Sequence, residues 1–134
     1  SDLHREIDRF ELKANAGAEY AITQPVFDLE MFYAFQASVE ERGLPLIAGI
    51  WPFTSYKNAE FMANEVPGVI VPQRLLDRMA SAKTRQDGRK IGVEIAHEMI
   101  AELSAHVAGF AVSAPLGQVD MALASLGRIS LKEE

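Results

Sequence analysis

The sequence predicts an α/β fold organised around a parallel β-sheet. Three short apolar runs, residues 18–24, 45–51 and 107–114, have the length and composition of buried strands. Amphipathic segments with capping residues at their starts separate these runs and predict helices. Strands that alternate with helices form parallel sheets with right-handed crossovers, so the order of the segments defines the fold class.

One helix is predicted before the first strand and another after it. Residues 2–17 carry an apolar stripe at helical spacing, formed by Leu3, Ile7, Phe10 and Ala14. Asp2 can cap this helix, and Gly17 can end it in the left-handed conformation. Asp28 is predicted to cap the next helix, which ends before Gly43.

Further helices are predicted on either side of the third strand. A helix over residues 54–66 is stopped by a Pro-Gly pair, and Pro72 takes the first helical position of the next one. Thr84 caps a long helix that continues to residue 106 with an unbroken apolar stripe. Residues 118–125 form a last short helix.

Composition predicts a single domain, residues 1–134. The chain is 49% hydrophobic and 24% charged, and no apolar run reaches the roughly 18–20 residues of a membrane span. A net charge of −6 argues against nucleic acid, whose phosphates require a basic face. There is no cysteine, and the polar first residues lack the features of a signal peptide. We therefore expect a cytoplasmic protein that partners neither nucleic acid nor a membrane.

We expect the sheet to be an arc of a barrel. Three strands cannot form a doubly wound sheet with both edges protected, whereas they can belong to a barrel whose other strands lie outside this sequence. The inner face of such an arc is predicted to expose apolar residues, namely Ile22, Ile47, Ile50 and Val112. Because an open apolar face and open edges favour pairing with another chain, a homo-oligomer is expected.

Gln24 is the leading candidate for a ligand contact. It ends the first apolar run, directly before Pro25, and the carboxyl ends of parallel strands form the ligand sites of such folds. An amide there can bind a heterocycle through one donated and one accepted hydrogen bond. Alternatively, Gln24 satisfies backbone groups of its own loop. Residues 51–53 and 113–118 follow the other two strands and are predicted at the same edge.

No metal centre is predicted, and the catalytic residues are unknown at this level. His97 is followed by a glutamate, but a zinc-protease motif needs a second histidine four residues on, and residue 101 is alanine. His97 is therefore interpreted as a helix-surface residue. Arg85, Arg89 and Lys90 gather near a helix start and are interpreted as a solvated basic face. No nucleophile has a neighbouring base.

The chain resembles the methylenetetrahydrofolate reductase family in three phrases that occur in order: NAGAEYAITQPVFD, GIWPFTSYKNAEFMANEVPGVIVPQRLLDRM and GVEIAHEMIAEL. The resemblance covers nearly the whole chain and matches the C-terminal part of that family's (β/α)8 TIM barrel. It implies an FAD-dependent oxidoreductase, a flavoprotein that reduces 5,10-methylenetetrahydrofolate to 5-methyltetrahydrofolate with NAD(P)H in one-carbon metabolism and methionine biosynthesis. The phrase GFAVSAP is most similar to the branch fused to a homocysteine S-methyltransferase domain.

The same resemblance implies roles for individual residues. The family's folate-binding glutamine matches Gln24, and a second folate-contacting glutamine falls on Asn58. The aromatic residue that stacks on the folate falls on Met62, next to Phe61.

The resemblance places the FAD contacts near the start of the chain. A lysine near the FAD matches Lys13, and an acidic FAD contact falls on Glu6, where aspartate is usual. Arg9 lies one turn from each and is a further candidate.

Two departures from the family bear on function. The family's F-H-F-Y-T-L-N-R at the last strand is FAVSAPLG at residues 110–117, so the arginine is absent. The first five-eighths of the barrel is also absent, and we expect the 134-residue chain alone to be inactive and to bind no FAD tightly. The competing interpretation is a non-catalytic barrel fragment that serves as a binding or self-association module. A yellow full-length protein would favour the reductase.

Overall fold

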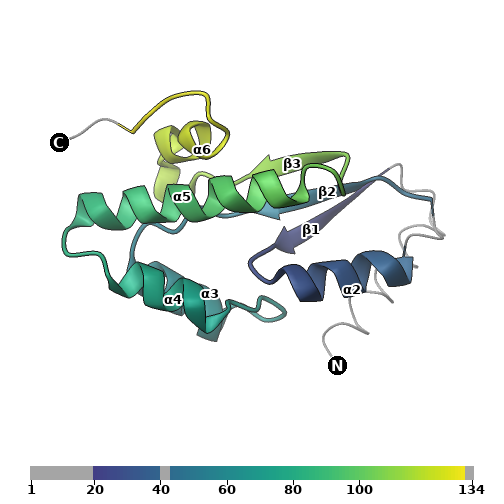
Figure 1. Ribbon diagram of the computed structural model, residues 1–134, viewed down its shortest axis with the longest axis horizontal. Coiled ribbons are helices and arrows are strands. Elements are labelled where there is room, and N and C mark those ends of the chain that lie inside the picture. Colours follow the sequence, from purple (N-terminus) through teal and green to yellow (C-terminus); the bar gives the residue numbers. More distant parts are fainter. Residues whose placement is uncertain (1–19, 40–42, 132–134) are drawn as a thin grey trace.

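The computed structural model describes residues 20–39 and 43–131 and contains a three-stranded parallel sheet (Figure 1). The strands are β1 (Ala21–Pro25), β2 (Leu46–Ile50) and β3 (Gly109–Val112), hydrogen-bonded in that order. The predicted α/β class and parallel pairing are confirmed. The third strand is shorter than its apolar run, although bonds from the backbone N–H groups of Ala108 and Ser113 to β2 extend the pairing at both ends.

Helices follow the strands in the predicted order. They are α2 (Leu29–Val39), α3 (Tyr56–Glu65), α4 (Gln73–Ala80), α5 (Arg85–Leu103) and α6 (Val119–Ser125), with a 3-10 turn, η2 (Pro115–Gly117), before α6. The helix expected over residues 2–17 lies outside the described residues. In the part of the chain that the structure describes, no helix combines the length and apolarity needed to cross a bilayer.

Two of the predicted helix caps are confirmed. The carboxylate of Asp28 accepts from the Met31 N–H at 3.2 Å, and the hydroxyl of Thr84 accepts from the Asp87 N–H at 3.1 Å. Pro72 is the N-cap of α4 rather than its first helical residue, because its ψ of 144° is extended.

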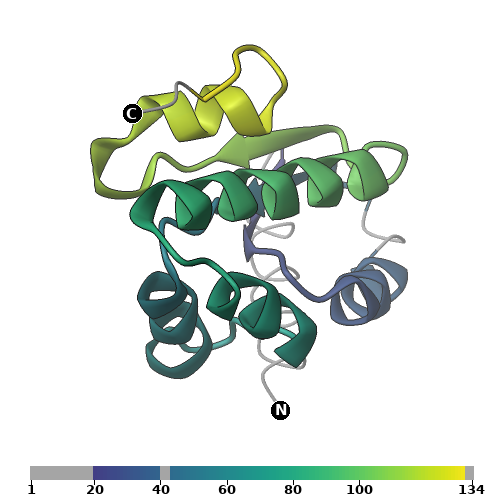
Figure 2. The same cartoon turned by 60° about the vertical axis from the view of Figure 1, so that its left-hand side comes forward.

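One face of the sheet is covered by helices. In Figure 2, α5 runs across this face above α2 and the α3–α4 pair. The core between α2, α5 and the sheet consists of Val26, Phe32, Ala48, Ile50, Ala96, Met99 and Leu103. A second core lies among α3, α4 and α5, where Phe27 and Phe53 stack with ring centroids 4.6 Å apart. These two cores fix the loops at the carboxyl ends of β1 and β2.

The expected inner face is only half right. Ile22 pairs with Ile47 in register, and Ile22 is 52% exposed, as predicted for the open face. Ile50 pairs with Val112, and both pack against the helices, with Ile50 only 1% exposed. Alternate strand residues point to opposite faces, so Ile47 and Ile50, three positions apart, cannot share one. The prediction was therefore wrong for Ile50 and Val112.

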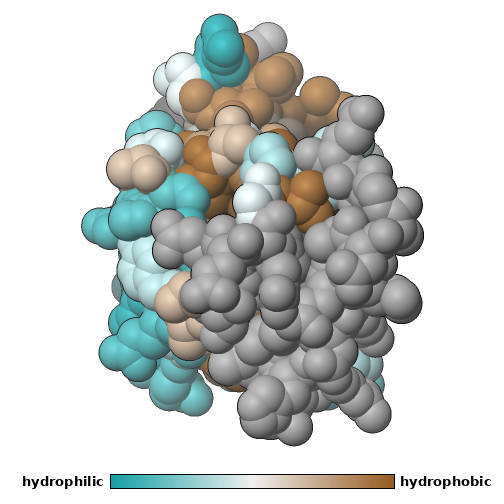
Figure 3. Space-filling model, turned by 90° about the vertical axis from the view of Figure 1, so that its right-hand side faces the viewer, coloured by the Kyte–Doolittle hydropathy of each residue, from teal (hydrophilic) through white to brown (hydrophobic). Residues whose placement is uncertain are grey.

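Apolar side chains also reach the surface near the C-terminal helix. The exposed large hydrophobic residues of η2, α6 and the segment after it are Leu116, Val119, Leu123, Leu126 and Ile129. Figure 3, which views the right-hand end of Figure 1, shows hydrophobic residues gathered toward the top of that end.

Candidate ligand-binding site

A bulge in β1 determines the position of Gln24. Between the pairs Ile22–Ile47 and Pro25–Gly49, β1 contains one residue more than β2. The Thr23 hydroxyl fills the gap in the ladder: it accepts from the Gly49 N–H at 3.0 Å and donates to the Gln24 carbonyl at 2.8 Å. The ladder resumes where the Val26 N–H bonds to the Gly49 carbonyl at 3.0 Å. The bulge therefore carries Gln24 at the carboxyl end of β1.

Gly49 makes this bulge possible. A Cβ at residue 49 would lie 2.7 Å from the Thr23 carbonyl oxygen and 3.1 Å from that of Gln24. Real Cβ atoms do not approach backbone oxygen as closely as the first of these distances, so only glycine allows the two strands to meet here. Glycine inside a strand is itself a signal of close backbone approach, and it could have indicated this feature from the sequence.

Gln24 is exposed, and its side-chain amide makes no hydrogen bond within the part of the chain that the structure describes. Its Oε1 lies beside Gly68, in the loop between α3 and α4, where a Cβ would come within 2.8 Å of it. The alternative role for Gln24, satisfying loop backbone groups with its amide, finds no support among these residues. As far as residues 20–39 and 43–131 are concerned, its donor and acceptor are therefore available to a ligand.

Asn58 follows the neighbouring strand and has a partly structural role. Its Oδ1 accepts from the Trp51 indole N–H at 3.0 Å and from the Thr54 backbone N–H at 3.2 Å. Its own backbone N–H bonds to the Ser55 hydroxyl, the N-cap of α3. The side-chain oxygen thus holds together the loop after β2, while Nδ2 has no recorded partner among the described residues. Asn58 can therefore offer Nδ2 to a ligand as a donor, whereas its acceptor, Oδ1, already accepts two hydrogen bonds.

Met62, the third expected substrate contact, lies inside the protein. It is 3% exposed and packs with Phe53 and Leu75 in the core among the helices. A side chain enclosed in this way has no free surface on which a ligand could stack. The neighbouring Phe61, one position earlier in α3, is 55% exposed. Glu6, Arg9 and Lys13, the expected cofactor contacts, lie outside the described residues.

Arg89 is not part of a solvated basic face. It is 8% exposed, its Nε donates to Gln118 Oε1 at 2.9 Å, and its guanidinium forms an ion pair with Asp120. The hydrogen bond and positive charge of Arg89 lower the pKa of Asp120 below its usual value, against a smaller opposing effect of burial. This arginine therefore ties α5 to the start of α6. The sequence interpretation was wrong because nothing in the spacing marks residues 118 and 120 as its partners.

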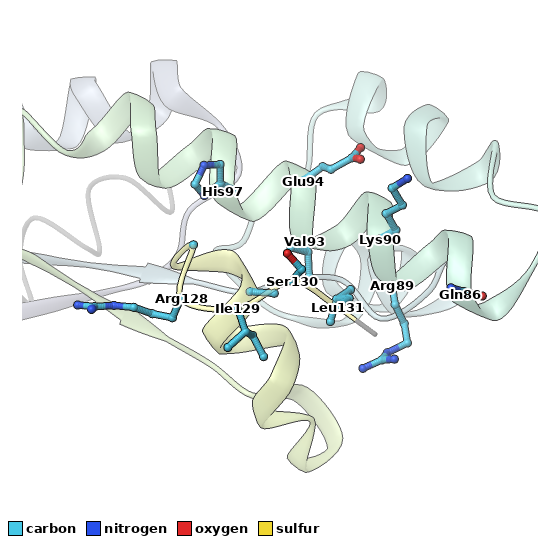
Figure 4. A pocket seen from close by; sticks show the side chains of 12 residues that line it. Gln86, Arg89, Lys90, Val93, Glu94, His97, Arg128, Ile129, Ser130 and Leu131 are labelled. Carbon is cyan, nitrogen blue, oxygen red and sulfur yellow. The ribbon is translucent and has the colours of Figure 1, made fainter. Parts of the chain in front are cut away.

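A surface hollow of about 730 Å³ lies between α5 and the segment after α6 (Figure 4). His97 lines it, and its Nδ1 lies 3.0 Å from the Ser125 carbonyl oxygen, to which it donates. The imidazole is exposed, as predicted for a helix-surface residue. Over residues 20–39 and 43–131, no three acidic or histidine side chains group as metal ligands. The hollow runs along α5, on the side that faces α6 and the segment after it.

The fold is that of part of an α/β barrel, and the candidate ligand groups, Gln24 and Asn58, lie at or after the carboxyl ends of two of its strands. Comparison with known proteins gives the family. The family described as methylenetetrahydrofolate reductase matches residues 1–114. The chain belongs to the methylenetetrahydrofolate reductase family.

Curated relatives agree with that assignment. The chain is 31% identical over 107 residues to "Methylenetetrahydrofolate reductase 1" of Schizosaccharomyces pombe, covering 78% of this chain and 18% of the relative. It is 34% identical over 94 residues to "Probable methylenetetrahydrofolate reductase (NADPH)" of Caenorhabditis elegans, covering 68% of this chain and 14% of the relative. The chain therefore spans less than a fifth of the length of these proteins.

Proposed function

We propose that the chain supplies the folate-binding end of the barrel in an enzyme that reduces 5,10-methylenetetrahydrofolate to 5-methyltetrahydrofolate. Family membership and the names of the relatives support this activity. The observation that carries the assignment of the site is the amide of Gln24, which is exposed at the carboxyl end of β1 and has no hydrogen-bond partner among residues 20–39 and 43–131. The relative named for NADPH supports a nicotinamide as the hydride donor.

Gln24 would orient the pterin ring of the folate. A flat heterocycle with adjacent donor and acceptor atoms matches a side-chain amide, which offers one of each without a charge. Fixing the ring in one orientation converts binding into a lower barrier for the reaction, and such positioning can supply several kcal/mol. The backbone bulge at Thr23 and Gly49 supports this role because it holds the main chain of Gln24 rigidly.

Asn58 would add a second polar contact from the neighbouring strand end. Its Nδ2 can donate to the folate while Oδ1 remains bonded to Trp51 and Thr54. Met62 would act indirectly, by supporting α3 from the core. Because Oδ1 of Asn58 is engaged within the loop, the proposed contact of Asn58 with the folate would use the Nδ2 donor alone.

FAD is the proposed flavin cofactor, and when bound it would supply the hydride-transfer chemistry. Glu6, Arg9 and Lys13 are the proposed contacts to it. The proposal extends to methionine biosynthesis in the cytoplasm, to a homo-oligomer, and to a fused homocysteine S-methyltransferase domain in the longer protein.

The test is Gln24→Ala in the full-length enzyme, with the two half-reactions followed separately by stopped-flow absorbance. We expect reoxidation of the flavin by the folate to slow by roughly tenfold or more, the scale of one lost orienting hydrogen bond, while reduction by the nicotinamide is unchanged. Gln36→Ala is the matched control: Gln36 bonds through Nε2 to the His106 carbonyl, before β3 begins. Equal slowing of both half-reactions by Gln24→Ala would make Gln24 structural.

A further inference from the structure

Gly68 occupies a position where any side chain would meet the Gln24 amide. A Cβ at residue 68 would lie 2.8 Å from Gln24 Oε1, 3.7 Å from its Cδ and 3.9 Å from its Nε2. All three of the nearest atoms belong to the end of that one side chain. The end of the Gln24 side chain therefore lies where a side chain at residue 68 would begin.

The loop that carries Gly68 is anchored on both sides. Val69 is 6% exposed and packs into the core formed by α3, α4 and α5, and its N–H bonds to the Val66 carbonyl at 3.3 Å. Val66 and Val71 pack against the same core. Gly68 itself has a φ of +81°, which favours glycine. The loop cannot easily move away from Gln24, whereas the long glutamine side chain can move away from the loop.

We infer that Gly68 is a positioning residue for Gln24: its missing side chain holds open the space in which the amide is oriented toward the substrate. The inference rests on the proposed function of Gln24. It goes further by naming a residue on a different element, the α3–α4 loop, that sets the specificity of the contact without touching the folate itself. Adding one methyl group at residue 68 would turn the amide to another rotamer and leave its chemistry intact.

The test compares Gly68→Ala with Gly43→Ala in the full-length enzyme. Gly43 is a matched control because its φ is +71° and no described atom lies within 4 Å of its hypothetical Cβ. Both variants thus carry the same left-handed strain, but only Gly68→Ala meets Gln24. We expect Gly68→Ala alone to slow flavin reoxidation by the folate by roughly tenfold, with reduction by the nicotinamide unchanged. The two variants should lose similar thermal stability.

A double-mutant cycle separates the possible outcomes. In the Gln24→Ala background, Gly68→Ala should cause no further loss, because the side chain that it displaces is gone. If Gln24→Ala slows the folate half-reaction but Gly68→Ala behaves like Gly43→Ala, the inference is overturned and the proposed function stands. If Gln24→Ala has no effect on either half-reaction, both the proposed function and the inference that rests on it are wrong. A loss from Gly68→Ala that persists without Gln24 also overturns the inference.

Discussion

Gly92 of α5 and Phe53 of the segment after β2 touch through their backbones. A Cβ at residue 92 would lie 1.8 Å from the Phe53 carbonyl oxygen and 2.8 Å from its carbonyl carbon. Phe53 is itself fully buried and stacks on Phe27, which follows β1. The contact therefore fixes α5, the loop after β2 and the loop after β1 relative to one another, just below the candidate site.

Gly92→Ala should be strongly destabilising. The new methyl group would overlap rigid backbone, so α5 must shift as a whole, and overpacking of this kind costs typically about 1–3 kcal/mol, occasionally more. Gly88→Ala, one turn earlier on the same helix, is the control, because its nearest contact would be an ordinary 3.4 Å. Its gain in helix propensity should make it neutral or slightly stabilising. Thermal unfolding of both variants compares their stabilities. Equal melting temperatures would contradict the close contact between Gly92 and Phe53.

The pair formed by Arg89 and Asp120 should make stability depend on pH in the acid range. The pKa of Asp120 is lowered in the folded state, so its stabilising contribution is complete above about the ordinary value of 3.8 and is lost as the pH falls through the lowered value. Asp120→Asn should cost about 1 kcal/mol or less at neutral pH, since water screens a carboxylate that is 45% exposed. The cost should shrink below pH 3.8.

Denaturant unfolding at a series of pH values measures this effect. Arg89→Met supplies the control, because removing the cation removes the cause of the lowered pKa. Asp120→Asn should then change little at any pH. A constant difference between wild type and Asp120→Asn from pH 7 to pH 3 would contradict the ion pair.

Gln24→Glu should be less harmful than Gln24→Ala, and increasingly so as the pH falls. A carboxylate accepts hydrogen bonds but donates none, whereas the protonated acid keeps one donor and one acceptor, as the amide does. The ratio of folate half-reaction rates, glutamate variant over alanine variant, should therefore rise as the pH is lowered from 8 toward 5. A ratio independent of pH would show that the ligand does not need the donor of Gln24.

Asn58→Asp should separate the structural role of Asn58 from its proposed role in binding. The carboxylate retains an acceptor for Trp51 and Thr54, and it lies in the first turn of α3, where negative charge is favourable. Stability should therefore be nearly unchanged, whereas Asn58→Ala should lose about 1 kcal/mol or more by leaving two partly buried donors unpaired. Both variants lack the Nδ2 donor, so both should slow the folate half-reaction. A fully active Asn58→Asp would restrict Asn58 to holding the loop.

The sequence could predict the elements and the sheet edge that carries the candidate residues, because these depend on local signals. Asp28 and Thr84 cap their helices through contacts three residues away, and an apolar run followed by a proline marks the end of β1. Periodicity also predicted α3, but it could not distinguish whether Met62 faces the core or the ligand. That distinction depends on the packing of α3 against α4 and α5.

Contacts between distant segments could not be read from local patterns. Arg89 reaches partners about 30 positions later, and Gly68 meets Gln24 across more than 40. The face of Ile50 could have been predicted, because strand alternation alone separates it from Ile47. The need for glycine at residue 92 depends on where the loop after β2 passes α5. The residue pattern of a helix carries no information about the position of that loop.

The isolated 134-residue chain should self-associate through its open sheet. Among the described residues, β1 and β3 are edge strands, and Ile22 on β1 is 52% exposed on the face that the helices do not cover. An exposed apolar edge strand pairs readily with another chain, and burying a side chain of this size contributes about 1.5–3 kcal/mol. Ile22→Thr should therefore shift the monomer–oligomer equilibrium, measured by sedimentation equilibrium at micromolar concentration, toward the monomer.

Ile70→Thr is the control: it is the same change at a residue that is 40% exposed outside the sheet, and it should leave the equilibrium unchanged. A wild-type chain that sediments as a compact 14.7 kDa monomer would show that its edges and open face need no partner.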